Sequence, residues 1–273
     1  MSMKSIVVIV RDNAGLEPML KTAVALTRRF DGHLTVGHIV PPAHMPAGAI
    51  GRAAAMEYVT EADETADAKA DRLHSKVNAL CEPHLKSWEW WVEHGDELEA
   101  ASRLVEMADL VIIEQRVQGV IEDLMSTDVV EHLLARGDCP LLMLPIGWQG
   151  GAVGEKILVA WKPTREAKRA VHDAVPLLVR AQDVFVLAAS GRRAEAAEAG
   201  SDVAAYLAHH GVQAQIVGES EDGDGDITAT ARRHGCDLIV MGAFHRSSLT
   251  ELVFGGATKF MMRHSKLPVL LRH

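Results

Sequence analysis

Glycines near the carboxyl end of the chain have a spacing that favours the binding of a phosphate or another anion. Gly242 follows the apolar run at residues 238–241, and Gly255 and Gly256 precede a segment with helical character. Glycine lets the backbone approach an anion closely, and a helix start presents unpaired N–H groups with partial positive charge. The segment therefore predicts an anion site between a strand and a helix. A plain turn followed by a helix start stays open as the alternative, because the segment is neither a Walker loop nor G-x-G-x-x-G.

Hydroxyl side chains in the same segment would add hydrogen-bond donors to such a site. Thr258 lies in the first turn of the expected helix, and Ser247 and Ser248 lie between the glycines. A hydroxyl group both donates and accepts hydrogen bonds, so each of these side chains suits a phosphate oxygen. Thr258 and Ser247 are therefore included in the candidate site.

Other patterns with possible chemistry are weaker. Asp222, Asp224 and Asp226 have the spacing of a calcium loop, but Ile227 and Arg233 occupy the positions that need glycine and glutamate. A solvated acidic loop is the better interpretation. The fourteen histidines are scattered, and the chain has no Gly-x-Ser-x-Gly elbow. We identify no catalytic residue and no metal site, which favours a protein that is not an enzyme.

The elements that would position the glycines occur twice along the chain. Apolar strands at 108–115 and 139–145 match those at 236–243 and 267–273, and both pairs are separated by 128 residues. Strands and helices alternate in each half, which predicts βαβ units and a parallel sheet. The expected strands lie at 4–10, 33–40, 86–92, 155–161, 183–189 and 212–217, and the expected helices at 53–84, 97–107, 193–209 and 227–234.

The expected fold class is α/β, with two tandem doubly wound domains. Each domain has a mainly parallel five-stranded sheet flanked by helices. The predicted domains are residues 1–147 and 152–273, with a glycine-rich linker between them. Trp88 and Trp90 share one face of a strand, which favours packing against a helix over an exposed patch for a partner.

Composition narrows the class of protein. The chain has 273 residues and a formal net charge of −9, which disfavours a general basic surface for nucleic acid. Cys81, Cys139 and Cys236 are far apart and odd in number, which indicates reduced thiols in a cytoplasmic protein. No segment approaches eighteen apolar residues, so no membrane span is expected.

The repeat, together with DLIVMGAFHRSSLTELVFGGATKFMMRHSKLPVLL at its end, resembles the universal stress protein family over nearly the whole chain. The nucleotide-binding members carry glycine, two residues, glycine, nine residues, glycine, then serine or threonine. Gly242 and Gly255 match this pattern, whereas His245 and Gly256 depart from it. The family's acidic residue after the first strand is replaced in the second half by Lys162.

The first half departs further from the family pattern. Glu114 stands at the first glycine position and Thr127 at the third, and Glu122, Asp123 and Asp128 add negative charge. Such charge would repel a triphosphate. Asp12 does match the family's acidic position. We expect the first half not to bind ATP and to serve a structural or partner-binding role.

The resemblance implies a cytoplasmic stress-response protein that works by binding. It implies ATP or another adenine nucleotide, with or without Mg²⁺, in the second half, at Gly242, His245, Ser247, Gly255, Gly256, Thr258 and Lys162. An interaction scaffold without nucleotide and a slow ATPase are the alternatives. The last strands of the two domains would pair edge to edge, as an intrachain pseudo-dimer. Dimerisation of the whole chain and the identity of protein partners stay open.

Overall fold

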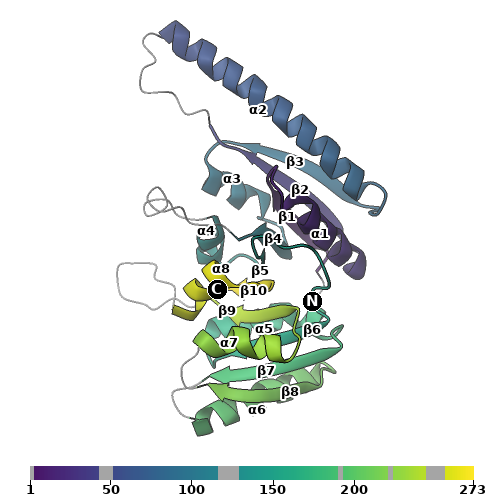
Figure 1. Cartoon of the computed structure of the whole chain (residues 1–273), viewed down its shortest axis with the longest axis vertical. Helices are drawn as coiled ribbons and strands as arrows, with labels where there is room; N and C mark the ends of the chain where they lie inside the picture. Colours follow the sequence, from purple (N-terminus) through teal and green to yellow (C-terminus); the bar gives the residue numbers. More distant parts are fainter. Residues whose placement is uncertain (1–2, 43–51, 116–128, 190–192, 221–223, 244–255) are drawn as a thin grey trace.

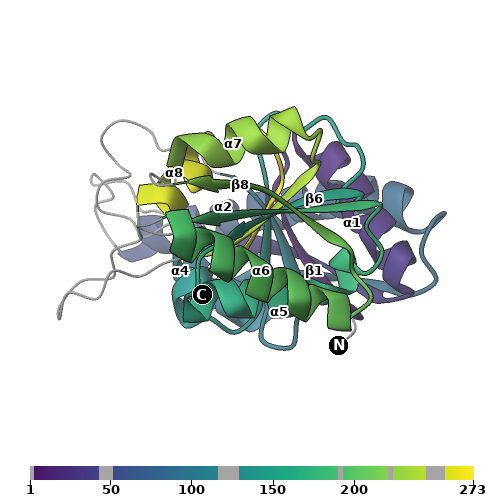
Figure 2. The same ribbon diagram turned by 90° about the horizontal axis from the view of Figure 1, so that it is seen from below.

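The computed structural model describes residues 3–42, 52–115, 129–189, 193–220, 224–243 and 256–273. Its strands form one ten-stranded sheet in the order β3-β2-β1-β4-β5-β10-β9-β6-β7-β8. Helices cover both faces of this sheet (Figures 1 and 2). The first five strands make one half of the sheet and the last five make the other, which confirms the predicted fold class.

The elements of the first half follow the expected alternation. They are β1 (Ser5–Val10), α1 (Leu16–Phe30), β2 (His33–Val40), α2 (Arg52–Cys81), β3 (Trp88–His94), α3 (Glu97–Leu104), β4 (Leu110–Glu114), α4 (Val129–Arg136) and β5 (Leu141–Leu144). The predicted third strand is shifted by two residues, because its pairing with β2 begins at Trp88. The helix after β3 ends at Leu104, three residues before the predicted end.

The second half repeats the pattern. Its elements are β6 (Lys156–Trp161), α5 (Arg165–Leu178), β7 (Asp183–Ala189), α6 (Arg193–His209), β8 (Ala214–Ser220), α7 (Asp224–Arg233), β9 (Leu238–Gly242), α8 (Gly256–His264) and β10 (Val269–Arg272). β4 and β9 begin 128 residues apart, as do β5 and β10, so the predicted repeat is confirmed. The α2 helix has 30 residues and α6 has 17, which is one difference in length between the halves.

The two halves meet at one antiparallel pair of strands. Leu142 of β5 lies opposite Leu270 of β10, whereas the strands within each half are parallel. The predicted edge-to-edge pairing is therefore present, and it makes the two five-stranded sheets into one continuous sheet. The predicted domain boundaries, 1–147 and 152–273, stay a prediction.

Two apolar cores lie on opposite faces of the sheet. One contains buried residues of α1, α2, α5 and α6, and the other contains those of α3, α4, α7 and α8. The sequence spacing of the following residues of α1 and α5 places them on one helical face, and all of them are buried: Leu16, Leu20, Ala23, Thr27, Phe30, Ala167, Ala170, Val171, Ala174 and Leu178. Each core extends over both halves, because the sheet is continuous.

The tryptophan pair of β3 packs as expected. Trp88 and Trp90 contact the first core, and the Trp90 ring stacks on His74 of α2 with 5.4 Å between centroids. Trp91 points to the other face and is exposed. The packing against a helix is therefore confirmed for the two residues that share a face.

An aspartate at equivalent positions holds the start of the first strand in each half. Asp109 accepts hydrogen bonds from the backbone N–H groups of Lys4 and Ser5, at 2.7 and 3.0 Å. Asp237 accepts from Gly154 at 2.7 Å and from the next two backbone N–H groups. A carboxylate is a strong acceptor for such donors. These two aspartates therefore tie β1 to β4 and β6 to β9.

Side chains also cross between the halves. Arg29 of α1 donates to the carbonyl oxygens of Val153, Gly154 and Arg180 in the second half. Gln115, which follows β4, donates to the Met262 carbonyl oxygen of α8 at 2.7 Å and is 5% exposed. These polar contacts fix the relative position of halves that already share two cores.

Replacing the aspartate that holds β6 is expected to destabilise the protein. Asp237→Asn keeps the shape of the side chain but removes the charge that strengthens its hydrogen bonds. The free energy of unfolding should fall by about 2 kcal/mol, measured by urea denaturation. Asp183→Asn is the control, because Asp183 forms an exposed ion pair with Lys156 at 3.2 Å and should cost less than about 1 kcal/mol. Equal losses for the two variants would contradict this role for Asp237.

The cysteines provide a test of burial in the native state. Cys81, Cys139 and Cys236 are free and buried, and burial raises the pKa of their thiols to about 11, about 12 and about 11. Because the folded pKa values lie above the ordinary value of 9.0, the stability they contribute is complete below pH 9 and is lost as the pH rises toward these values. At pH 8 a disulfide reagent such as DTNB should label the three thiols rapidly in 8 M urea and slowly in buffer. Rapid labelling of all three in buffer would contradict this burial.

Candidate functional site

The candidate site lies where β6 and β9 end side by side. Ala160 of β6 pairs with Met241 of β9, so the next residues, Trp161 and Gly242, are adjacent. Lys162 follows at the end of β6 and is exposed, whereas Gly242 is buried. Because parallel strands place ligands beyond their carboxyl ends, this edge is where a nucleotide is expected in such a sheet.

Gly242 is needed because the start of α5 lies directly against it. A Cβ atom at Gly242 would lie 2.5 Å from the Ala167 nitrogen and 2.7 Å from the Glu166 carbonyl carbon. No side chain fits at that distance without moving the helix backbone. Thr164 caps the same helix, with its Oγ1 accepting from the Ala167 N–H at 3.4 Å. Glycine therefore brings the positive end of α5 to the end of β9.

The start of α8 supplies the other predicted residues. Gly256 begins the helix and is exposed, whereas Thr258 is fully buried. Met261 and Met262 anchor the helix in the second core, and Met262 is the residue whose carbonyl oxygen Gln115 contacts. Thr258 thus lies on the inner side of α8, not on its exposed surface.

Three of the predicted residues lie outside the described residues. They are His245, Ser247 and Gly255. The structure therefore brings together the ends of β6 and β9 and the start of α5, with Lys162 and Gly242 among the predicted residues.

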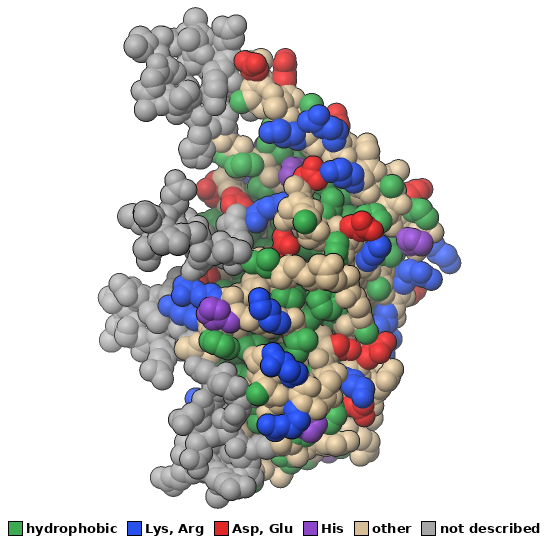
Figure 3. Space-filling view, viewed as in Figure 1, with side chains coloured by type: hydrophobic (Ala, Val, Ile, Leu, Met, Phe, Trp, Pro, Cys, Tyr) green, Lys and Arg blue, Asp and Glu red, His purple; other side chains and the backbone are tan. Residues whose placement is uncertain are grey.

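The charge around the second-half edge is mixed but carries several cations. Arg165 begins α5 beside Lys162 and is followed by Glu166, and α8 carries Lys259 and Arg263. Figure 3 shows Lys and Arg side chains near the part of the surface where Figure 1 places α8. Among the described residues, no three histidine, cysteine, aspartate or glutamate side chains gather to hold a metal ion.

The equivalent edge of the first half is filled by a carboxylate. Glu114 ends β4 at the position equivalent to Gly242, and its carboxylate lies so close to Gly15 that a Cβ there would clash with it. Asn13 donates to Glu114 Oε2 at 2.6 Å and accepts from the Gly15 N–H at 2.9 Å. A negative side chain thus occupies the region at the start of α1.

Asp12, another acidic residue of the first-half edge, is also paired, whereas Glu122, Asp123 and Asp128 lie outside the described residues. Asp12 forms an ion pair with Lys76 of α2 at 2.6 Å. Sequence reasoning identified Asp12 and Glu114 but missed Asn13, which joins Glu114 to the start of the helix. The Asn-x-Gly sequence before α1 was the available signal, because asparagine often bonds the backbone two residues on.

No described helix is long and apolar enough to cross a membrane. The model of the universal stress protein family matches residues 3–145 and 184–273. No curated protein matches the sequence.

Two solved structures cover nearly the whole chain. A universal stress protein from Archaeoglobus fulgidus is 15% identical, with a TM-score of 0.77, over 99% of this chain and 97% of its own. A functionally unknown protein from Pseudomonas aeruginosa is 18% identical, with a TM-score of 0.57, over 99% of this chain and 92% of its own. At these identities the two structures support the fold. Because the family model covers most of the sequence in two regions, the chain belongs to the universal stress protein family as a tandem member.

Proposed function

We propose that this chain acts in the cytoplasmic stress response by binding, and that its second half binds ATP or another adenine nucleotide. The contrast between the two equivalent strand ends carries this proposal. In the first half Glu114 places a carboxylate against the start of α1, whereas in the second half Gly242 has no side chain and lies against the start of α5. Among the described residues, β4 therefore places a carboxylate at the start of α1, whereas β9 places no side chain at the start of α5.

The described residues divide the binding between backbone and side chains. The start of α5 lies against the end of β9, and we assign its positive dipole, together with that of α8, to the phosphates. Lys162 adds a cation where the family's nucleotide binders carry an acid, so we assign it to phosphate and not to ribose or a metal. Mg²⁺ would arrive bound to the nucleotide. His245, Ser247 and Gly255 belong to the proposed site by their place in the sequence motif, and Thr258 supports α8 from within.

A negative charge at the start of α8 should weaken nucleotide binding without harming the helix. Gly256 is exposed, and the equivalent first-half residue, 128 positions earlier, is Asp128. Gly256→Asp suits a helix start but repels phosphate, so we expect ATP affinity to fall at least tenfold in calorimetric titration. Ala229→Asp, on the exposed side of α7, adds the same charge elsewhere and should leave the affinity within about twofold.

The stoichiometry of the same titration tests the assignment to one half. Protein freed of nucleotide, as checked by absorbance, should bind one ATP per chain, with or without Mg²⁺. Two sites would contradict the role given to Glu114. The absence of saturable binding up to millimolar ATP would reject the nucleotide proposal and leave the interaction scaffold. Phosphate release that Gly256→Asp abolishes would instead assign a slow ATPase.

Removing the cation at the end of β6 should reduce affinity in a way that depends on the phosphates. Lys162→Gln is expected to weaken ATP binding about three- to tenfold and adenosine binding hardly at all, because only the phosphates carry the opposite charge. Lys21→Gln, on α1 of the first half, is the control and should change neither affinity. Equal losses for ATP and adenosine would place Lys162 away from the phosphates.

A further inference from the structure

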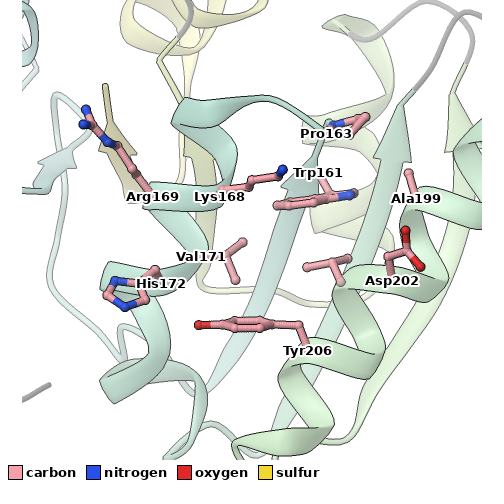
Figure 4. A pocket seen from close by; sticks show the side chains of 10 residues that line it. Trp161, Pro163, Lys168, Arg169, Val171, His172, Ala199, Asp202 and Tyr206 are labelled. Atoms are coloured by element: carbon pink, nitrogen blue, oxygen red, sulfur yellow. The ribbon is translucent and has the colours of Figure 1, made fainter.

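A cavity of the second half lies between α5 and α6, beside the end of β6. Its volume is about 590 Å³, which is within the usual range for small-molecule sites. Figure 4 shows Trp161 at one end, Val171 on the α5 side, and Tyr206 of α6 at the other end. Ala199 and Val203 of α6 complete a largely apolar wall. The cavity is thus shaped and lined for an apolar body.

Trp161 brings an unsatisfied donor to this cavity. It is the last residue of β6, its side chain is 7% exposed, and its Nε1 is closed to solvent and has no hydrogen-bond partner. A buried N–H group without a partner is costly, and native proteins rarely keep one without a reason. Trp161 also lines the cavity (Figure 4), and because its Nε1 is covered in this structure, an acceptor oxygen of an occupant reaches it only when the indole ring turns or its neighbours shift.

The opening of the cavity carries more positive than negative groups. Lys168 and His172 of α5 are exposed beside it, and Arg169 is half-buried. Arg169 donates to the His273 carbonyl oxygen at 3.1 Å, and this hydrogen bond fixes the position of its side chain. Asp202 of α6 is the acid at the opening and is exposed. Figure 4 shows Lys168 extending from α5 toward Trp161.

We propose that this cavity binds a medium-chain carboxylic acid, with its apolar chain between α5 and α6 and its carboxylate accepting from Trp161 Nε1. A carboxylate has only acceptors, which matches the lone donor of Trp161, and Lys168 supplies the opposite charge. The apolar chain packs against Val171, Val203 and Tyr206, which border the cavity.

This site adjoins the one proposed for nucleotide but extends away from it. The cavity meets the end of β6 at Trp161 and Pro163 and runs between α5 and α6, whereas the nucleotide site lies at the ends of β6 and β9 and the starts of α5 and α8. The proposal therefore goes beyond the proposed function. The two proposals can be tested independently, because Gly256→Asp should weaken ATP binding and leave the binding of the carboxylic acid unchanged.

The test is calorimetric titration of the full chain with decanoate, decanol and decylamine. Decanoate should bind at one site per chain in the micromolar range, and decanol should bind at least tenfold more weakly because it lacks the charge. Equal affinity for decanol, tighter binding of decylamine, or no binding of decanoate at 1 mM would each overturn the proposal.

Variants of the cavity locate the binding. Trp161→Phe keeps an aromatic ring but removes the N–H, so decanoate affinity should fall about tenfold. Trp91→Phe makes the same change at an exposed tryptophan of the first half and should have no effect. Ala199→Phe fills the cavity from α6 and should abolish binding while thermal unfolding shows a folded chain. Unchanged affinity in both Trp161→Phe and Ala199→Phe would overturn the assignment to this cavity, as would equal losses in the two tryptophan variants.

Discussion

The antiparallel pair of β5 and β10 is the constraint on which the rest of the structure depends. Each strand has four residues, and nearly all of their side chains are buried. Alone, either half would end its sheet in an apolar edge with unpaired backbone groups, which is a template for aggregation. Pairing Leu142 with Leu270 removes both edges at once. Each half therefore needs the other to cover its exposed sheet edge, independently of any ligand.

This mutual need explains how one half can keep its fold after losing the family's glycine pattern. The shared cores and the contacts of Arg29 and Gln115 across the halves do not depend on a ligand. Glu114 can therefore occupy the start of α1 without a cost to the sheet, and its bond from Asn13 orders the loop there. Gly242 is under the opposite constraint, because the α5 backbone leaves it no room for a side chain.

The sequence predicted those features that rest on local pattern. The helical faces of α1 and α5 follow from residues such as Leu20 and Ala170, whose spacing alone places them inside. The repeat of β4 in β9 follows from two apolar runs at one offset. The strand order could not be read in this way, because it depends on pairing between strands far apart in the sequence. The family resemblance predicted one part of it, the edge-to-edge pairing of the last strands of the two domains.

The details of the site that escaped prediction are contacts over long sequence distances. Gly242 contacts the start of α5, and Asp237 accepts hydrogen bonds from the start of β6. Each of these contacts joins segments more than 70 residues apart in the sequence. The cavity beside Trp161 was missed for a related reason. A strand-end tryptophan looks like ordinary core in the sequence. That Trp161 lines a cavity between α5 and α6 and that its Nε1 has no hydrogen-bond partner both depend on how β6, α5 and α6 pack together, which no local pattern of residues specifies.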